Sequence, residues 1–287
     1  MAVSPSMTFL PRARSFDWNN FAVRAASGLV LACAALAAVW VFGWRPTLWR
    51  APFLVMIAVA GVLLSIEWAA MAAPRAAKRA AVLTSLAVVG VILLAFVGRY
   101  GEAWGCVGLG ALIVAAVTRG AAQRPIDGAY GVLYIAPACL ALVWLIETKQ
   151  GPGWTMMLFA ATWSADIAAF LVGSAFKGPK LWPRFSPNKT WSGFIGGLLG
   201  AILASVGVAA AFMHLSLIGA ALIGLAGGLA TMAGDLWESM LKRRFGVKDS
   251  GDLIPGHGGL LDRVDGLMFA VMVFAIARLV VEFGWAH

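Results

Sequence analysis

Residues 80–97 read AAVLTSLAVVGVILLAFV, a stretch without a charged side chain. A continuous apolar run of about 18 residues or more spans the hydrocarbon core of a bilayer as an α-helix, whereas buried strands of soluble proteins are about four to eight residues long. Lys78 and Arg79 precede the stretch and Arg99 follows it, so charged residues occur at its ends. The stretch therefore predicts a membrane-spanning helix.

Similar apolar runs recur along the whole chain. Hydrophobic residues make up 61% of the 287 positions and charged residues only 12%, whereas soluble domains have about half and about a quarter. Helices are expected because the backbone N–H and C=O groups of an open strand would have no hydrogen-bond partners in lipid. A β-barrel would instead show short segments in which apolar and polar residues alternate. We predict an all-α polytopic integral membrane protein with about nine transmembrane helices, at about residues 25–42, 52–72, 80–97, 103–118, 129–146, 154–173, 191–213, 216–234 and 266–283.

The basic residues predict how these helices are oriented. Seventeen Lys and Arg residues fall in the N-terminal segment and the even-numbered loops, and four fall in the remaining loops. Cytoplasmic loops carry such an excess, so we expect a cytoplasmic N-terminus and an external C-terminus. The net charge of +9 is then explained by loops at anionic headgroups, and a nucleic-acid partner is not expected.

Acidic residues are concentrated near the C-terminal end, where six of the thirteen lie between positions 235 and 265. Helical spacing would place Asp235, Ser239 and Lys242 on one face, and Asp262 and Asp265 on one face of the next helix. Carboxylates at membrane depth are costly unless they are paired or bind a cation. Oxygen ligands without a His or Cys cluster favour Mg²⁺. A network of structural salt bridges explains the same residues equally well at this stage.

A second polar stretch, residues 186–193 (SPNKTWSG), precedes the seventh run. A helix N-terminus beside Lys189 is a natural anion site, and Thr190 or Asn188 is a candidate helix cap. Asp166 lies deep within an apolar run, which by default marks a functional position, although a hydrogen-bonded structural Asp is the alternative. Both polar loops fall on the predicted cytoplasmic side, so we expect them to form one site.

Glycines stand out in two places. Residues 255–259 read PGHGG, and a glycine-rich backbone can approach phosphate oxygens closely. Within this stretch we interpret His257 as a phosphate donor or positioning group. Pairs of glycines at four-residue spacing in the seventh and eighth runs indicate close helix packing; these pairs are Gly193/Gly197, Gly196/Gly200 and Gly224/Gly228.

From Ser239 to Asp265 the chain reads SMLKRRFGVKDSGDLIPGHGGLLDRVD. This resembles the signature of the phosphatidate cytidylyltransferases (CDP-diacylglycerol synthases), with every fixed position filled. The similarity extends more loosely to residues 166–173 and 186–193. Two positions depart from the family pattern, because Phe170 stands where Tyr is common and Ser192 where Glu or Gln is common.

The resemblance implies a membrane enzyme that converts CTP and phosphatidic acid to CDP-diacylglycerol and pyrophosphate with Mg²⁺, and a second cation such as K⁺ is a further expectation. It also implies a homodimer in the bacterial inner membrane with a cytoplasmic active site. Residues 151–287 would form the catalytic region, and residues 1–150 would be a scaffold or dimer surface.

The resemblance and the spacing together assign roles to individual residues. The expected catalytic residues are Asp235, Ser239, Lys242, Asp262 and Asp265. The expected metal ligands are Asp235 and Asp262, supported by Asp265 and Asp249. The expected substrate-binding residues are Asp166, Ser186, Lys189, Thr190, Arg243, Lys248, Asp249, His257, Gly258, Gly259 and Arg263.

Two other functions are alternatives. A CTP-dependent lipid-alcohol kinase would use the same nucleotide but release CDP instead of pyrophosphate. An ion-coupled transporter would use Asp166 on its pathway, but transporters place their polar groups near the bilayer midplane. The charges here gather at one side of the membrane, which disfavours transport.

Overall fold

The computed structural model of the chain describes residues 28, 30, 33–39, 51–122, 124–183, 186–251 and 258–284. In this part of the chain, eight helices are long and apolar enough to cross a membrane. They are α2 (Ala51–Ala72), α3 (Ala77–Phe96, after the short 3-10 helix η3, Pro74–Ala76), α4 (Tyr100–Val117), α5 (Pro125–Glu147), α6 (Gly151–Phe176), α7 (Trp191–Phe212), α8 (Leu217–Phe245) and α9 (Leu261–Gly284).

These helices confirm the predicted all-α polytopic membrane protein, and they match the second to ninth apolar runs. The first predicted run lies largely outside the described residues, although residues 33–37 within it are helical. One small element was not predicted. Strands β1 (Lys180–Trp182) and β2 (Ser186–Thr190) form an antiparallel hairpin between α6 and α7. A strand with open edges is tolerated where water can hydrate its backbone, so the hairpin belongs outside the hydrocarbon layer.

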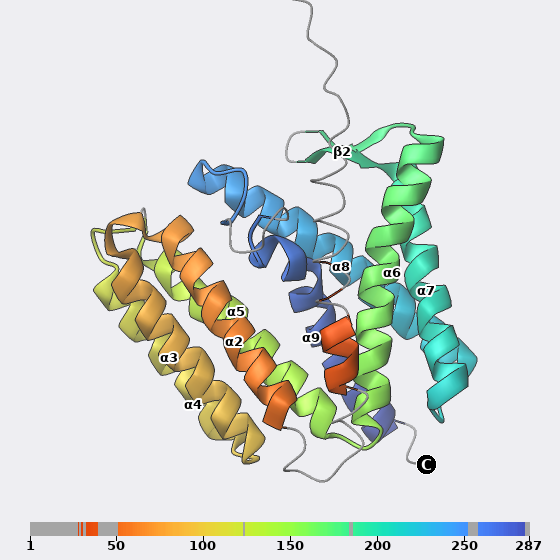
Figure 1. Cartoon of the computed structure of the whole chain (residues 1–287), viewed down its shortest axis with the longest axis horizontal. Coiled ribbons are helices and arrows are strands. Elements are labelled where there is room, and N and C mark those ends of the chain that lie inside the picture. Colours follow the sequence, from red (N-terminus) through yellow and green to blue (C-terminus); the bar gives the residue numbers. More distant parts are fainter. Residues whose placement is uncertain are drawn as a thin grey trace, which may run out of the picture.

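The helices form two neighbouring groups, with α2–α5 on one side and α6–α9 on the other (Figure 1). The C-terminal ends of α2, α4, α6 and α8 lie at the end of the molecule that carries the β hairpin, and the C-terminal end of α9 lies at the other end (Figure 1). At that second end, the backbone N–H of His214 donates to the Gln150 side chain, which joins two loops expected outside. The loops predicted to share the cytoplasmic side therefore do share one end of the bundle.

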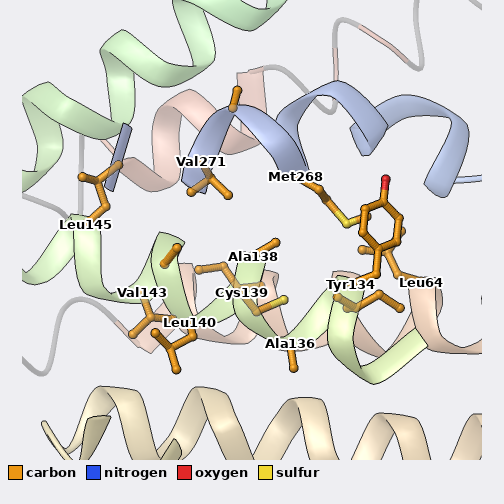
Figure 2. Close-up of a cluster of buried hydrophobic side chains, with 14 of the residues drawn as sticks. Leu64, Tyr134, Ala136, Ala138, Cys139, Leu140, Val143, Leu145, Met268 and Val271 are labelled. Carbon is orange, nitrogen blue, oxygen red and sulfur yellow. The ribbon is translucent and has the colours of Figure 1, made fainter. Parts of the chain in front are cut away.

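A continuous hydrophobic core joins the two groups. Helices α5 and α9 pack against each other through buried side chains that include Tyr134, Val143, Met268 and Val271 (Figure 2). Cys139 lies buried in the same layer, as expected for a small apolar side chain. The core thus runs through both groups. The division into residues 1–150 and 151–287 stays a prediction.

Glycines allow α7 to lie close to both of its neighbours. A Cβ atom on Gly197 would come within 2.8 Å of the Ala165 carbonyl oxygen in α6. A Cβ atom on Gly224 in α8 would come within 2.8 Å of the Ala201 carbonyl oxygen in α7. The close helix packing predicted from the glycine spacing is confirmed.

Helix α8 carries the site residues beyond the hydrophobic layer. Its 29 residues span about 43 Å, which exceeds the roughly 30 Å of a hydrocarbon core. The helix ends at Gly246, which has a φ of 76°. Three basic residues occupy the last turn, where positive charge is favourable: Lys242, Arg243 and Arg244. Because the helix is continuous from Leu217 to Phe245, the shared face predicted for Asp235, Ser239 and Lys242 is confirmed.

Candidate active site

The two polar loops meet through an ion pair between Lys189 and Asp235. Lys189 belongs to β2, whereas Asp235 lies where α8 leaves its apolar segment. Their side chains are 28% and 35% exposed, so both remain accessible to a ligand. The next residue of the strand, Thr190, is buried and its hydroxyl accepts the Gly193 N–H at 3.1 Å. The cap therefore fixes the end of β2 at the start of α7 and places Lys189 beside α8.

A second ion cluster lies one helical turn further along α8. The Lys242 ammonium is 2.8 Å from a Glu238 carboxylate oxygen and 2.5 Å from an Asp262 carboxylate oxygen. The Lys242 and Asp262 side chains are only 13% and 9% exposed, and Glu238 is buried. Buried charges of this kind are tolerated only when they are paired. The cluster therefore joins α8 to α9 through charge.

Asp262 also orders the loop that precedes α9. One of its carboxylate oxygens accepts the backbone N–H of Ser250 at 3.1 Å and that of Gly259 at 3.2 Å. An ionised carboxylate offers about four acceptor positions, and Lys242 and the two amides use three of them. Asp262 thus has about one position left for a metal ion, which makes its structural role larger than the sequence indicated.

Close contact between α8 and α9 brings further carboxylates together. A Cβ atom on Gly234 would come within 2.5 Å of the Asp265 carbonyl oxygen, and one on Gly266 within 3.0 Å of the Thr231 carbonyl oxygen. The two backbones can approach this closely because neither glycine has a side chain. As a result, Asp265 interacts electrostatically with both Asp235 and Glu238.

Asp166 of α6 completes this acidic group. Its charged neighbours come from three other elements, and they are Asp235, Lys189 and Arg263. Two adjacent carboxylates such as Glu238 and Asp265 repel each other unless a proton or a cation lies between them. The group therefore offers oxygen ligands to a cation and has basic side chains beside it.

The donor set fits Mg²⁺ that binds together with a nucleotide. Among the described residues, no three His, Cys, Asp or Glu side chains converge closely enough to hold a metal ion by themselves. Mg²⁺ usually needs only one or two protein carboxylates, because water and substrate phosphates complete its shell. Asp235 and Asp265 offer such carboxylates.

The remaining predicted residues differ in their exposure. Arg243, Lys248 and Asp249 are exposed near the end of α8, and Ser239 and Ser186 are partly buried. Gly258 has a φ of 84°, and Gly259 is buried against residues 250 and 251. His257 lies outside the described residues. Ser192, one of the two departures from the family pattern, makes a hydrogen bond with the Thr190 hydroxyl at 3.0 Å.

Two carboxylates at this site were not identified from the sequence. Glu238 is one of the six clustered acids, and its four-residue helical spacing to Lys242 is the signal for it. Glu67 is outside the predicted site, yet it is only 3% exposed and accepts hydrogen bonds from the start of α9. A carboxylate within the apolar run of α2 was the signal for Glu67.

Comparison with known sequences supports the interpretation of this geometry. The sequence profile of the cytidylyltransferase family matches residues 22–281. The chain belongs to this family. The match includes α2–α8 and most of α9, so family membership covers both groups of helices and confirms the resemblance stated from residues 239–265.

Individual relatives within the family carry a common name. A phosphatidate cytidylyltransferase of Brucella suis is 38% identical over 256 residues, which cover 88% of this chain and 91% of the relative. One from Pseudomonas aeruginosa is 40% identical over 161 residues, covering 54% and 57%. One from Staphylococcus epidermidis is 37% identical over 153 residues, covering 52% and 58%. The enzyme class expected from the sequence is thereby confirmed.

Proposed function

We propose that this protein transfers the cytidylyl group of CTP to phosphatidic acid at the cytoplasmic face of a bacterial inner membrane, with Mg²⁺ as cofactor. The observation that carries this proposal is the convergence of Lys189 with Asp235 beside the Lys242 ion cluster, in a member of the cytidylyltransferase family. Basic and acidic groups on one end of a helical bundle suit a triphosphate and a lipid headgroup that meet at the membrane surface.

The reaction balances without a large change in protonation. A phosphate oxygen of phosphatidic acid attacks the α-phosphorus of CTP and forms the new P–O bond. The bond from the α-phosphorus to the oxygen bridging to the β-phosphorus breaks, and pyrophosphate leaves. The protein therefore has to align the two phosphates and offset their negative charge.

The basic residues provide this charge balance. In our proposal Lys189 and Arg263 bind phosphates beside Asp235, and Arg243 and Lys248 attract the nucleotide from the cytoplasm. Fixed cations that need no rearrangement during the reaction stabilise the transition state most effectively. Lys242 stays close to the reacting phosphates because Glu238 and Asp262 hold it.

The acidic residues would hold the cofactor. Asp235 and Asp265 are the proposed first ligands, with Asp166 beside them, and Asp262 and Asp249 as further candidates. When bound, Mg²⁺ would offset charge on the triphosphate and on the departing pyrophosphate. A second cation such as K⁺ and assembly as a homodimer are part of the same proposal, which takes them from the resemblance to the family.

A product assay tests the proposal. Purified protein in detergent micelles receives phosphatidic acid and CTP labelled in the α-phosphate, with and without a chelator. We expect labelled CDP-diacylglycerol and free pyrophosphate, and loss of both when the chelator is added. Release of CDP with a phosphorylated lipid would instead identify a CTP-dependent lipid kinase.

A further inference from the structure

Glu67 connects the first group of helices to the segment that precedes α9. It lies in the last third of α2, about 190 residues before the segment it contacts. One carboxylate oxygen accepts the Leu260 N–H at 2.8 Å, and the other accepts the Leu261 N–H at 2.7 Å. The second oxygen also lies 3.4 Å from the Ser250 hydroxyl. Both oxygens of one buried carboxylate thus accept hydrogen bonds from residues on the two sides of segment 252–257.

These contacts lie at the N-terminus of α9. The first N–H groups of a helix have no partner within the helix, and a negative charge there is favourable. Leu261 is the first residue of α9, so Glu67 supplies from another helix the acceptor that a capping residue would normally supply. The position of this terminus also sets the position of Asp262, the next residue.

The loop backbone is shaped to admit the Glu67 side chain. A Cβ atom on Gly251 would come within 3.1 Å of a Glu67 carboxylate oxygen, and one on Gly259 within 3.0 Å of the same oxygen. Both positions are glycine, so the backbone can pass directly over the carboxylate.

Glu67 and Asp262 bind different backbone donors of the same segment. Asp262 accepts hydrogen bonds from the N–H groups of Ser250 and Gly259, whereas Glu67 accepts them from the N–H groups of Leu260 and Leu261. The two carboxylates together satisfy four backbone donors at the ends of the loop.

We propose that Glu67 is a positioning residue for the transfer reaction, and this inference rests on the proposed function. It holds the start of α9 so that Asp262 keeps Lys242 at the reacting phosphates. Helix α2 is then part of the active-site support, which gives the N-terminal group of helices a role beyond scaffold or dimer surface.

The test is Glu67→Gln in the full-length protein. Either orientation of the amide turns an NH₂ group toward a backbone N–H, so one of the two short hydrogen bonds is lost. We expect kcat to fall by about ten- to a hundredfold, the usual effect of removing a residue that orients an active-site group. Amide hydrogen exchange should accelerate at Leu260 and Leu261 and stay unchanged in α3 and α4. Glu67→Asp keeps the charge and should recover part of kcat.

The matched control is Glu102→Gln, the same substitution at an exposed carboxylate paired with Arg99 near the other end of the bundle. It should behave as wild type in both measurements. A Glu67→Gln protein with wild-type kcat would overturn the proposal. So would faster exchange throughout the bundle without a local excess at residues 260 and 261, because that pattern indicates a purely structural role.

If Glu67→Gln does not fold, Gly251→Ala tests the same contact from the loop, since its new methyl group meets the Glu67 side chain. It should reproduce the loss of kcat and the faster local exchange, and wild-type values for both would contradict the proposal. Failure of the proposed function is recognised separately, because wild-type protein would then form no CDP-diacylglycerol while the exchange measurement remains interpretable.

Discussion

At the scale of single residues, the charges at this site divide into a buried cluster and an accessible pair. Lys242 lies between Glu238 and Asp262 with little exposure, so its charge is needed to keep two carboxylates at this depth. Lys189 and Asp235 are about a third exposed, so water and ions weaken their attraction. The Lys242 cluster is therefore expected to contribute to stability as well as to the reaction, whereas the Lys189–Asp235 pair is expected to serve substrate binding with little effect on stability.

Replacement of Lys242 by Met should destabilise the protein strongly. It leaves Glu238 and Asp262 buried without their cation, and such a loss costs about 3–5 kcal/mol of unfolding free energy. Denaturant titration of the purified protein measures this. The double variant Lys242→Met/Glu238→Gln should recover part of the stability and none of the activity. Wild-type stability in the single variant would contradict the role given to the cluster.

Replacement of Lys189 by Ala should have the opposite balance of effects. An ion pair with this exposure contributes about 1 kcal/mol or less to stability, so the unfolding midpoint should barely move. Turnover should fall by about a hundredfold, because a fixed cation at the phosphates is lost. Lys180→Ala, which removes the exposed lysine of the facing strand β1, should retain wild-type turnover. Equal turnover in both variants would contradict the proposal that Lys189 binds the reacting phosphates.

At the scale of elements, the crossing of α8 and α9 sets the distances between carboxylates. Gly234 and Gly266 let the two backbones approach, and this brings Asp235 and Asp265 within electrostatic range. Helices with larger residues at these positions would have to separate. The acidic group is thus a property of the helix pair as much as of the aspartates.

Gly234→Ala tests this dependence. The new methyl group would come within 2.5 Å of a backbone oxygen of α9, so the helices must shift, at a cost of about 1–3 kcal/mol. Activity and the unfolding midpoint should both fall. Gly207→Ala in α7 is the matched control, because a Cβ atom there meets nothing within 4 Å. It should leave both measurements at wild-type values, whereas equal losses in the two variants would argue against a specific role for the crossing.

At the scale of the whole molecule, the eight described helices place four loops at one end of the bundle (Figure 1). The β hairpin, the end of α8 and the start of α9 all lie there, and so does the end of α2 that carries Glu67. In the proposed function, a water-soluble nucleotide and a membrane lipid would meet at this end of the bundle. The orientation in the membrane itself stays a prediction from the basic loops.

Cysteine labelling tests this orientation. In a background with Cys33, Cys106 and Cys139 replaced, single cysteines at the exposed positions Asn188 and Asp249 should react only with reagent applied from the cytoplasmic side. A cysteine at the exposed position Lys149 should react only from outside. Labelling of positions 188 and 249 from opposite sides would contradict the single site.

Much of this protein follows from local sequence. The apolar runs predicted the membrane helices, because backbone in lipid must satisfy its own hydrogen bonds. The shared face of Asp235 and Lys242 followed from helical spacing, and the signature from Ser239 to Asp265 indicated the family. Each of these features depends on residues that lie close together in the chain.

Only the tertiary structure determined which distant residues meet. The Leu260 and Leu261 N–H groups donate hydrogen bonds to Glu67, and Lys189 forms an ion pair with Asp235, so each of these contacts joins segments that are far apart in the chain. No periodicity predicts such pairs, because they depend on which helix faces pack together and on how closely glycines let them approach. The charges were visible in the sequence, whereas their partners were set by the packing of α2, α6, α8 and α9.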